Sequence, residues 1–125
     1  MKKDITNRAD IELLMERFYT KLLNDETIAH IFTDVAKIDL DHHLPILTDF
    51  WETVLLGKNV YHNNTMKVHM DLNAKEPLTK AHFETWLKHF YDTVDELFEG
   101  DISLRAKQRA TSVATVMQIK IIEMR

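Results

Sequence analysis

Histidine and aromatic residues are the side chains of this sequence that could do chemistry. Its 125 residues include seven histidines, six phenylalanines, three tyrosines and two tryptophans, but no cysteine. Without cysteine the chain can form no disulfide, thiol nucleophile, iron–sulfur cluster or Cys-x-x-Cys-His cofactor attachment. The same absence makes a reducing cytoplasm the expected compartment. The search for a site therefore begins with histidine, with tyrosine and tryptophan as candidate hydrogen-bond donors.

His69 is the first candidate metal ligand. It lies in a short segment with apolar periodicity, Met66–Leu72, between two polar, turn-rich segments. A helix of this length stabilises itself poorly, and a histidine on such a loop-flanked helix can reach a metal from the side. Imidazole nitrogen is the standard axial ligand of haem iron in oxygen-binding proteins. Taken alone, a histidine in this position is more often a surface residue, so both interpretations stay open.

His43 is the second candidate, because of its helical phase. It begins an apolar stripe at helical spacing, whereas His42 is offset from that stripe by about 100°. We therefore expect His43 to point inward and His42 to point away. The alternative is a partly exposed histidine at the solvent edge of the stripe. The members of the stripe are His43, Ile46, Leu47, Phe50 and Val54.

Tyr19 and Trp86 are aromatic residues on predicted buried faces that also carry a hydrogen-bond donor. When buried, these donors usually need a partner. Core packing with a local backbone acceptor is the commoner case for a single residue. The functional interpretation is that both donors face an oxygen-derived ligand on a haem iron, where they stabilise developing negative charge in a dry pocket. The apolar aromatic residues that would then line the pocket, rather than fill a core, are Phe18, Phe32, Phe50 and Phe90.

Other sites fit the sequence less well. A di-iron bundle would need paired Glu-x-x-His motifs, and the segment at His82 has the wrong spacing and order. A serine-based catalytic triad would need a sharp, strained turn for its nucleophile, and the sequence shows no such turn. A zinc site could in principle use four histidines, but no His-x-x-x-His or carboxylate spacing on one helix supports it. These histidines are His42, His43, His62 and His69.

Long helices must position these residues, because only two glycines and two prolines occur, where average usage gives roughly 15 of the two types together. A β-sandwich would need a turn signal every ~8–12 residues, and a phosphate-binding loop would need closely spaced glycines. Apolar periodicity predicts an all-α chain, roughly three-quarters helical. The four long helices are expected over Thr6–Leu23, from Asp39 or Asp41 to Leu56, from Thr79 to Gly100, and from Asp101 or Ser103 onward.

Particular residues predict how these helices begin and end. Thr79 is an N-cap candidate, Pro45 suits the first turn of its helix, and Gly57 and Gly100 are placed to end helices. A further short helical turn, opened by Asp25-Glu26-Thr27, is expected to carry Ile28, Ile31 and Phe32. The last helix is expected to be buried through Ala106, Ala110, Val113, Met117 and Ile121.

Charge and hydropathy limit the classes of function. The net charge is −4, with the signs interspersed, which disfavours a nucleic-acid partner. No run approaches ~18 uncharged apolar residues, so no membrane span is expected, and the first residues lack the apolar region of a signal peptide. Residues 1–125 have the length of a single domain with one core.

A series of short motifs runs in order, at compatible spacing, from about Ile11 to Met117. They are Phe18-Tyr19, Ile31-Phe32, His43 seven residues before Phe50-Trp51, Leu55-Leu56-Gly57, His69, Trp86-Leu87 with Phe90, and Arg109-Ala110. Together they resemble the third group of truncated haemoglobins. The other two truncated groups carry glycine pairs at helix junctions, and this sequence has none.

The resemblance implies a truncated globin-like two-over-two helical sandwich that holds haem b without a covalent bond. By similarity, His69 is the proximal iron ligand, Tyr19 and Trp86 are distal donors to the bound ligand, and His43 lies where the ligand side is gated. The remaining residues expected to contact the cofactor are Phe32, Ile46, Leu47, Phe50, Met66 and Phe90.

The expected function is binding of O₂, NO or CO, followed by redox chemistry of the bound ligand such as NO dioxygenation or peroxide handling. Two polar donors suit chemistry on the ligand better than simple carriage, and a separate reductase would then supply electrons. The alternatives are a non-catalytic O₂ carrier or sensor and, more remotely, a helical interaction module without a cofactor.

Overall fold

The computed structural model describes residues 2–35, 37, 39–58 and 78–123 of the chain. Within these ranges every regular element is helical, which confirms the expected all-α class. The elements are α1 (Arg8–Leu23), a short π-helix that we call η1 (Ile31–Val35), α2 (Leu40–Leu56), α4 (Lys80–Leu97) and α5 (Asp101–Glu123). The predicted Met66–Leu72 helix lies outside the described residues.

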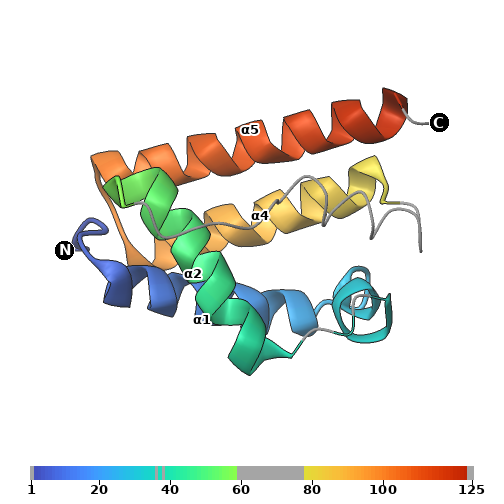
Figure 1. Ribbon diagram of the computed structural model, residues 1–125, viewed down its shortest axis with the longest axis horizontal. Helices are drawn as coiled ribbons and strands as arrows, with labels where there is room; N and C mark the ends of the chain where they lie inside the picture. Colours follow the sequence, from blue (N-terminus) through green and yellow to red (C-terminus); the bar gives the residue numbers. More distant parts are fainter. Residues whose placement is uncertain (1, 36, 38, 59–77, 124–125) are drawn as a thin grey trace.

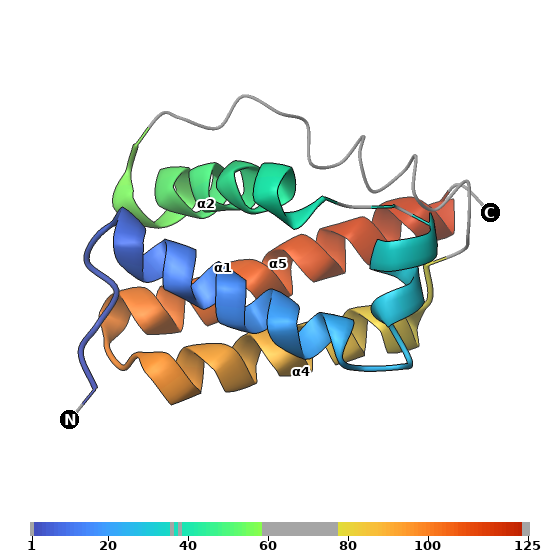
Figure 2. The ribbon, with the colours of Figure 1, turned by 90° about the horizontal axis from the view of Figure 1, so that it is seen from below.

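The helices form two pairs (Figures 1 and 2). In one pair α4 and α5 lie side by side and antiparallel, and in the other α1 packs against α2. Contacts between α1 and α4 join the two pairs, and α2 also touches α5. The arrangement is the expected two-over-two sandwich.

Side-chain caps fix the helix starts close to where the sequence predicts them. The Asn7 side chain accepts a hydrogen bond from the backbone N–H of Asp10, so α1 begins slightly later than Thr6. The Asp39 side chain caps α2. Thr79 and His82 cap α4 reciprocally, because each side chain accepts a hydrogen bond from the other residue's backbone N–H. Such capping satisfies helix N–H groups that have no partner within the helix.

Two predicted helix positions are wrong. Pro45 lies in the second turn of α2, not in the first, because the helix begins at Leu40; its ring therefore removes one internal backbone hydrogen bond. Gly100 does not end α4. That helix ends at Leu97, and Gly100 precedes α5 with a φ of 145°. Gly57 does end α2 as predicted, in the left-handed conformation with a φ of 73°.

Helix α5 packs on the rest of the molecule through a strip of small residues. Ala106, Ala110, Ala114 and Met117 are buried. Val113, which was expected to be buried, is half-buried at the edge of this strip. The side chain of Ile121 lies outside what the structure describes.

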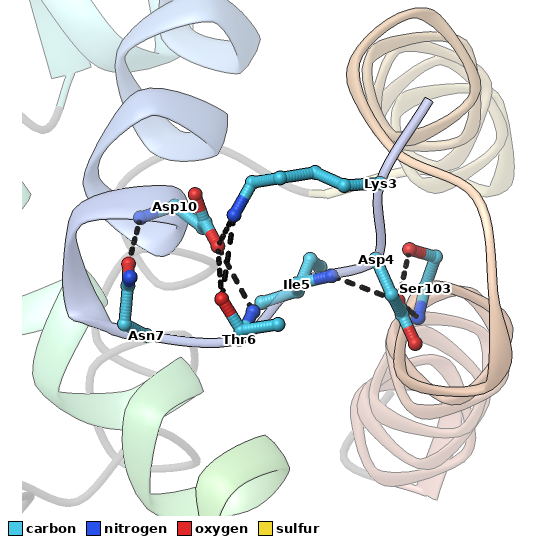
Figure 3. Close-up of polar contacts among 7 residues, drawn as sticks. All are labelled: Lys3, Asp4, Ile5, Thr6, Asn7, Asp10 and Ser103. Atoms are coloured by element: carbon cyan, nitrogen blue, oxygen red, sulfur yellow. Dashed lines mark hydrogen bonds and ion pairs between the residues drawn. The ribbon is translucent and has the colours of Figure 1, made fainter. Parts of the chain in front are cut away.

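The N-terminal segment anchors the beginning of α5 (Figure 3). Asp4 Oδ1 lies 2.8 Å from the backbone N and 2.7 Å from the hydroxyl of Ser103. Asp4 Oδ2 accepts a 2.9 Å hydrogen bond from the backbone N–H of Ile102. A Cβ added at Gly100 would lie 2.5 Å from Asp4 Cγ. The absence of a side chain at Gly100 therefore lets Asp4 reach the first turn of α5.

A second carboxylate ties the same segment to α1. Asp10 Oδ2 accepts hydrogen bonds from Lys3 Nζ at 2.7 Å, from the Thr6 backbone N–H at 2.9 Å and from the Thr6 hydroxyl at 3.1 Å. Ile5, between the two anchors, is buried in the core. The N-terminal segment thus connects α1 to α5.

Candidate functional site

Tyr19 and His43, which the sequence predicts as site residues on different helices, meet in the structure. The Tyr19 hydroxyl lies 3.2 Å from His43 Nε2, which is within hydrogen-bond distance. Tyr19 is 4% exposed, and burial raises the pKa of its hydroxyl above the ordinary value. The hydroxyl therefore keeps its proton and remains a donor across the working pH range.

The Tyr19 ring is held in place by aromatic rings around it. Phe18, Phe32 and His43 each contact it edge-on at a centroid distance of 5.5 Å. Edge-to-face contacts are among the favourable arrangements for aromatic pairs. Because these neighbours come from α1, η1 and α2, three elements fix the position of the Tyr19 hydroxyl.

Phe18 links Tyr19 to a second group of rings. Its ring lies 5.6 Å from that of Trp86 and 5.2 Å from that of Phe90. Phe90 is stacked on Trp51 at 4.9 Å and on Trp86 at 5.8 Å. Trp51 in turn contacts Phe50 at 5.2 Å. We call the connected set the aromatic network; it consists of Phe18, Tyr19, Phe32, His43, Phe50, Trp51, Trp86 and Phe90.

Within this network Phe90 and Trp86 differ in exposure. Phe90 is 0% exposed, so protein side chains cover it on all sides and it backs the Trp86 ring. Trp86 is half-buried, and its indole N–H has no hydrogen-bond acceptor in the part of the chain that the structure describes. The Trp86 N–H is thus a hydrogen-bond donor on an indole ring that Phe18 and Phe90 hold in place.

Helix α2 packs against the protein on two faces, and the predicted apolar stripe is not the more deeply buried. Thr48, Trp51, Glu52 and Leu55 are buried, and Arg8 of α1 reaches Glu52 Oε1 at 3.0 Å. The predicted stripe is only half-buried. Successive helix residues point about 100° apart, so the two faces lie side by side around the helix. The half-buried residues of the predicted stripe are His43, Ile46, Leu47, Phe50 and Val54.

A half-buried apolar face beside a packed one suits a flat apolar ligand. The packed face anchors α2 to the protein, while the other carries Leu47 and Phe50 on the same stripe as His43, which contacts the Tyr19 hydroxyl. His42 is exposed, as its helical phase predicts. Ligand pockets combine an apolar lining with a few polar groups that orient the ligand, and this region has both.

The structure therefore brings some of the predicted site residues together, whereas others lie outside the residues that it describes. Tyr19, Phe32, His43, Phe50, Trp86 and Phe90 belong to one aromatic network. His69 and Met66 lie outside the described residues. The stacking of Trp51 on Phe90 was not anticipated; the only signal for it in the sequence is a second aromatic residue directly after Phe50.

Two further observations concern the alternatives. Within the described ranges, no three His, Asp or Glu side chains are grouped so that they could hold a metal ion. Among the same residues, no helix has both the length and the apolar character needed to cross a membrane.

Comparison with known proteins gives one consistent result. Residues 3–121 match the family model described as bacterial-like globin. The chain is 30% identical over 121 residues to the group 3 truncated haemoglobin of Campylobacter jejuni, covering 94% of this chain and 93% of that protein. The crystal structure of the group III truncated haemoglobin from Campylobacter jejuni superposes with a TM-score of 0.86 at 28% identity, covering 97% of this chain and 95% of the other.

Proposed function

Because the chain belongs to the bacterial-like globin family, among the group 3 truncated haemoglobins, and so binds haem and diatomic gases, we propose that it carries out redox chemistry on the bound gas. The proposed reactions are NO dioxygenation or peroxide reduction in the cytoplasm. The observation that carries this proposal is the pair of polar donors, Tyr19 and Trp86, in an otherwise aromatic region.

The described residues fit one side of such a cofactor. The half-buried stripe of α2 offers an apolar face, and Tyr19, His43 and Trp86 offer the polar groups. We propose that the haem is haem b and is held noncovalently, with His69 as its iron ligand and Met66 as a neighbour. Bound there, haem supplies an iron centre that takes up O₂, NO or CO and exchanges one electron.

The role proposed for Tyr19 and Trp86 is to stabilise negative charge on the ligand. A hydrogen bond to a charged acceptor contributes about 1.5–3 kcal/mol, which corresponds to roughly 10- to 150-fold in the dissociation rate of the ligand. Aromatic residues around both donors lower the local dielectric, which strengthens such bonds. Slow release suits reaction of the ligand better than delivery.

The proposed reactions need an electron source. NO dioxygenation converts one NO, one O₂ and one electron into nitrate; peroxide reduction converts one H₂O₂, two electrons and two protons into two water molecules. We propose that a separate electron-donor protein supplies these electrons, because the described residues include no redox-active group of their own other than aromatic side chains.

Rapid mixing of the oxygenated protein with NO tests the proposed reaction. We expect fast loss of NO, one nitrate per NO consumed, and ferric protein as the product. Slow or absent conversion to nitrate, together with rapid release of O₂, would favour the carrier or sensor. An absorption spectrum without a Soret band after reconstitution with haemin would contradict every version of the function that uses haem.

A further inference from the structure

We propose that the solvent-facing side of α5 is a docking surface for an acidic electron-donor protein. The surface consists of Arg105, Arg109, Ser112, Val116 and Ile119, which we call the outer stripe of α5. This inference rests on the proposed function, because it names the kind of protein that supplies the electrons and the place where that protein binds.

Charge is distributed unevenly between α5 and the rest of the chain. From residue 102 to residue 120 the sequence has four lysine or arginine residues and no aspartate or glutamate, although the whole chain has a net charge of −4. Lys107 is paired with Asp95. Arg105 and Arg109 are exposed, and neither forms an ion pair within the part of the chain that the structure describes. The outer stripe is therefore a basic surface on an acidic protein.

The same side of α5 exposes apolar side chains. Among the residues that the structure describes, the exposed large apolar side chains are Leu104, Val116 and Ile119, at 52%, 47% and 51% exposure, and all three lie on α5. Apolar residues scattered singly over a surface are normal, whereas a group of them beside polar residues is typical of an interaction site.

The spacing of the outer stripe places its members in line along the helix. The residues follow one another at intervals of four, three, four and three positions, which is the spacing that keeps side chains on one seam of a helix. Successive residues are about 100° apart, so Ser112 points nearly opposite to the buried Ala110. The stripe therefore faces solvent, with two arginines at one end, two apolar residues at the other and a small serine between them.

This order of residues disfavours a second copy of the chain as the partner. An antiparallel pair of α5 helices would set Arg105 and Arg109 against Val116 and Ile119 of the other copy, and a parallel pair would set arginine against arginine. Neither arrangement gives the arginines a carboxylate from the outer stripe. Like charges that meet across an interface cost several kcal/mol.

A protein with carboxylates opposite the arginines and an apolar patch opposite Val116 and Ile119 fits both ends of the stripe. Arginine is enriched in protein interfaces and can bind a carboxylate through two parallel hydrogen bonds. Complementary charge raises the rate of encounter more than it raises affinity. Fast encounter with modest affinity suits an electron donor, which has to bind, transfer its electron and leave.

The outer stripe is also close to the aromatic network. The small side chains of Ala106, Ala110 and Ala114 are buried, and α5 lies along α4, which carries Trp86 and Phe90 (Figure 1). A protein bound on the outer stripe is thus separated from the network by one helix, about 10–12 Å in diameter. That position suits electron delivery to a haem held beside Trp86.

The kinetic test uses the ferric, haem-loaded protein and reduced flavodoxin, chosen as a small acidic protein that donates single electrons. Each transfer oxidises the flavin by one electron and reduces the haem iron from ferric to ferrous. In stopped-flow mixing, the second-order rate constant should fall as ionic strength rises, because salt screens the attraction. The double variant Arg105→Glu/Arg109→Glu should lower this constant by roughly 10-fold or more at low salt. Reduction by dithionite, which needs no docking surface, should stay nearly the same.

A matched pair of single variants separates docking from net charge. Arg105→Glu and Arg17→Glu change the net charge equally, but Arg17 is exposed on α1. We expect a large loss of rate only in Arg105→Glu. An equal loss in both variants would show that overall charge, not the outer stripe, governs the encounter, and would overturn the inference.

A binding measurement is independent of electron transfer. In NMR titration of the ferrous CO form with oxidised flavodoxin, the amide signals that shift should lie on α5, and Val116→Ser should weaken the binding. Shifts centred on another element would overturn the inference. So would binding of α5 to phosphatidylglycerol vesicles but not to flavodoxin, or a dimer in sedimentation that Val116→Ser abolishes, because a membrane or a second copy would then occupy the stripe.

Failure of this inference is distinguishable from failure of the proposed reaction. Rapid mixing of NO with protein that already carries O₂ needs no electron donor during the measurement. If nitrate forms there while flavodoxin does not dock on α5, only the docking surface is refuted. If flavodoxin docks and reduces the haem while no nitrate forms, NO dioxygenation is refuted and the docking surface stands.

Discussion

The Asp4 carboxylate caps the first turn of α5 by accepting hydrogen bonds from both the backbone N–H and the hydroxyl of Ser103. The residue that directly precedes α5 is Gly100, and glycine has no side chain with which to cap. A carboxylate at a helix N-terminus satisfies free N–H groups and interacts favourably with the helix dipole. A residue from the N-terminal segment thus performs a function that usually belongs to the helix's own cap.

Removal of this carboxylate should destabilise the protein. We expect Asp4→Ala to lower the free energy of unfolding by about 0.5–2 kcal/mol, the range for loss of a helix cap. Urea denaturation followed by circular dichroism measures it. Glu12→Ala, on the exposed side of α1, is the control and should change stability little. An Asp4→Ala protein as stable as the Glu12→Ala protein would show that the cap contributes nothing.

Acid should weaken the contact between α4 and the segment after α1. The His89 side chain lies 2.7 Å from Asp25 Oδ2, and this hydrogen bond, with those from Thr27, lowers the pKa of Asp25 from 3.8 to about 2. A carboxylate with a lowered pKa in the folded state stabilises the protein above its unfolded pKa, and this contribution is lost as the pH falls from about 4 to about 2.

The variant that tests this is Asp25→Asn. Its free energy of unfolding should fall less steeply than that of the wild type over that pH range. Chemical denaturation at a series of pH values gives the two slopes. Glu16→Gln, which removes an exposed carboxylate from α1, is the control and should keep the wild-type slope. Equal slopes for Asp25→Asn and the wild type would contradict the assignment. Asp4 and Asp10 add to the acid sensitivity of both proteins. Burial raises the pKa of each carboxyl, but the hydrogen bonds that it accepts lower the pKa by more, so the net pKa lies below its usual value.

Trp86→Phe should speed the loss of O₂ from the haem-loaded protein. The substitution keeps an aromatic ring against Phe18 and Phe90 but removes the indole N–H. If that N–H holds the ligand, the dissociation rate should rise by roughly 10-fold or more. Trp51→Phe alters the other ring stacked on Phe90 and should leave the rate nearly unchanged. A similar rate change in both variants would point to altered packing instead of a lost donor.

His69→Ala should abolish normal haem retention. If His69 is the iron ligand, the variant should lose haem during gel filtration, and added imidazole should restore part of the binding. His42→Ala, which changes an exposed histidine on α2, should retain haem normally. An unchanged axial ligand in the ferrous spectrum of His69→Ala would exclude His69 as the proximal residue.

Short-range signals predicted much of the fold. The capping of α4 by Thr79 and the end of α2 at Gly57 depend on residues within a few positions of the helix end. The inward positions of Tyr19 and His43 also follow from local phase, but the sequence did not predict that these two side chains meet. Helical period is enough to place such residues on an inward face, because that face is defined by apolar neighbours within one or two turns of the same helix.

The features that were missed depend on contacts between distant parts of the chain. Gly100 resembled a helix terminator, yet its lack of a side chain serves the approach of Asp4. In α2 the periodicity showed an apolar stripe but could not show that the adjacent face, with Thr48 and Trp51, packs more deeply against the protein. Helical period identifies an apolar stripe, but it does not say which of two adjacent faces of a helix packs more deeply against the other helices.

The anchoring of α5 by Asp4 also has a consequence for the order of events during synthesis. Asp4 and Ser103 are 99 residues apart, so at ~5–20 residues per second a ribosome needs about 5–20 s to make the second after the first. In the later part of that interval α1 and α2 have been made and can pair, whereas Asp4 still lacks its partners on α5, Ile102 and Ser103. The N-terminal segment is therefore expected to dock last, and its docking joins the earliest-made part of the chain to the latest-made helix.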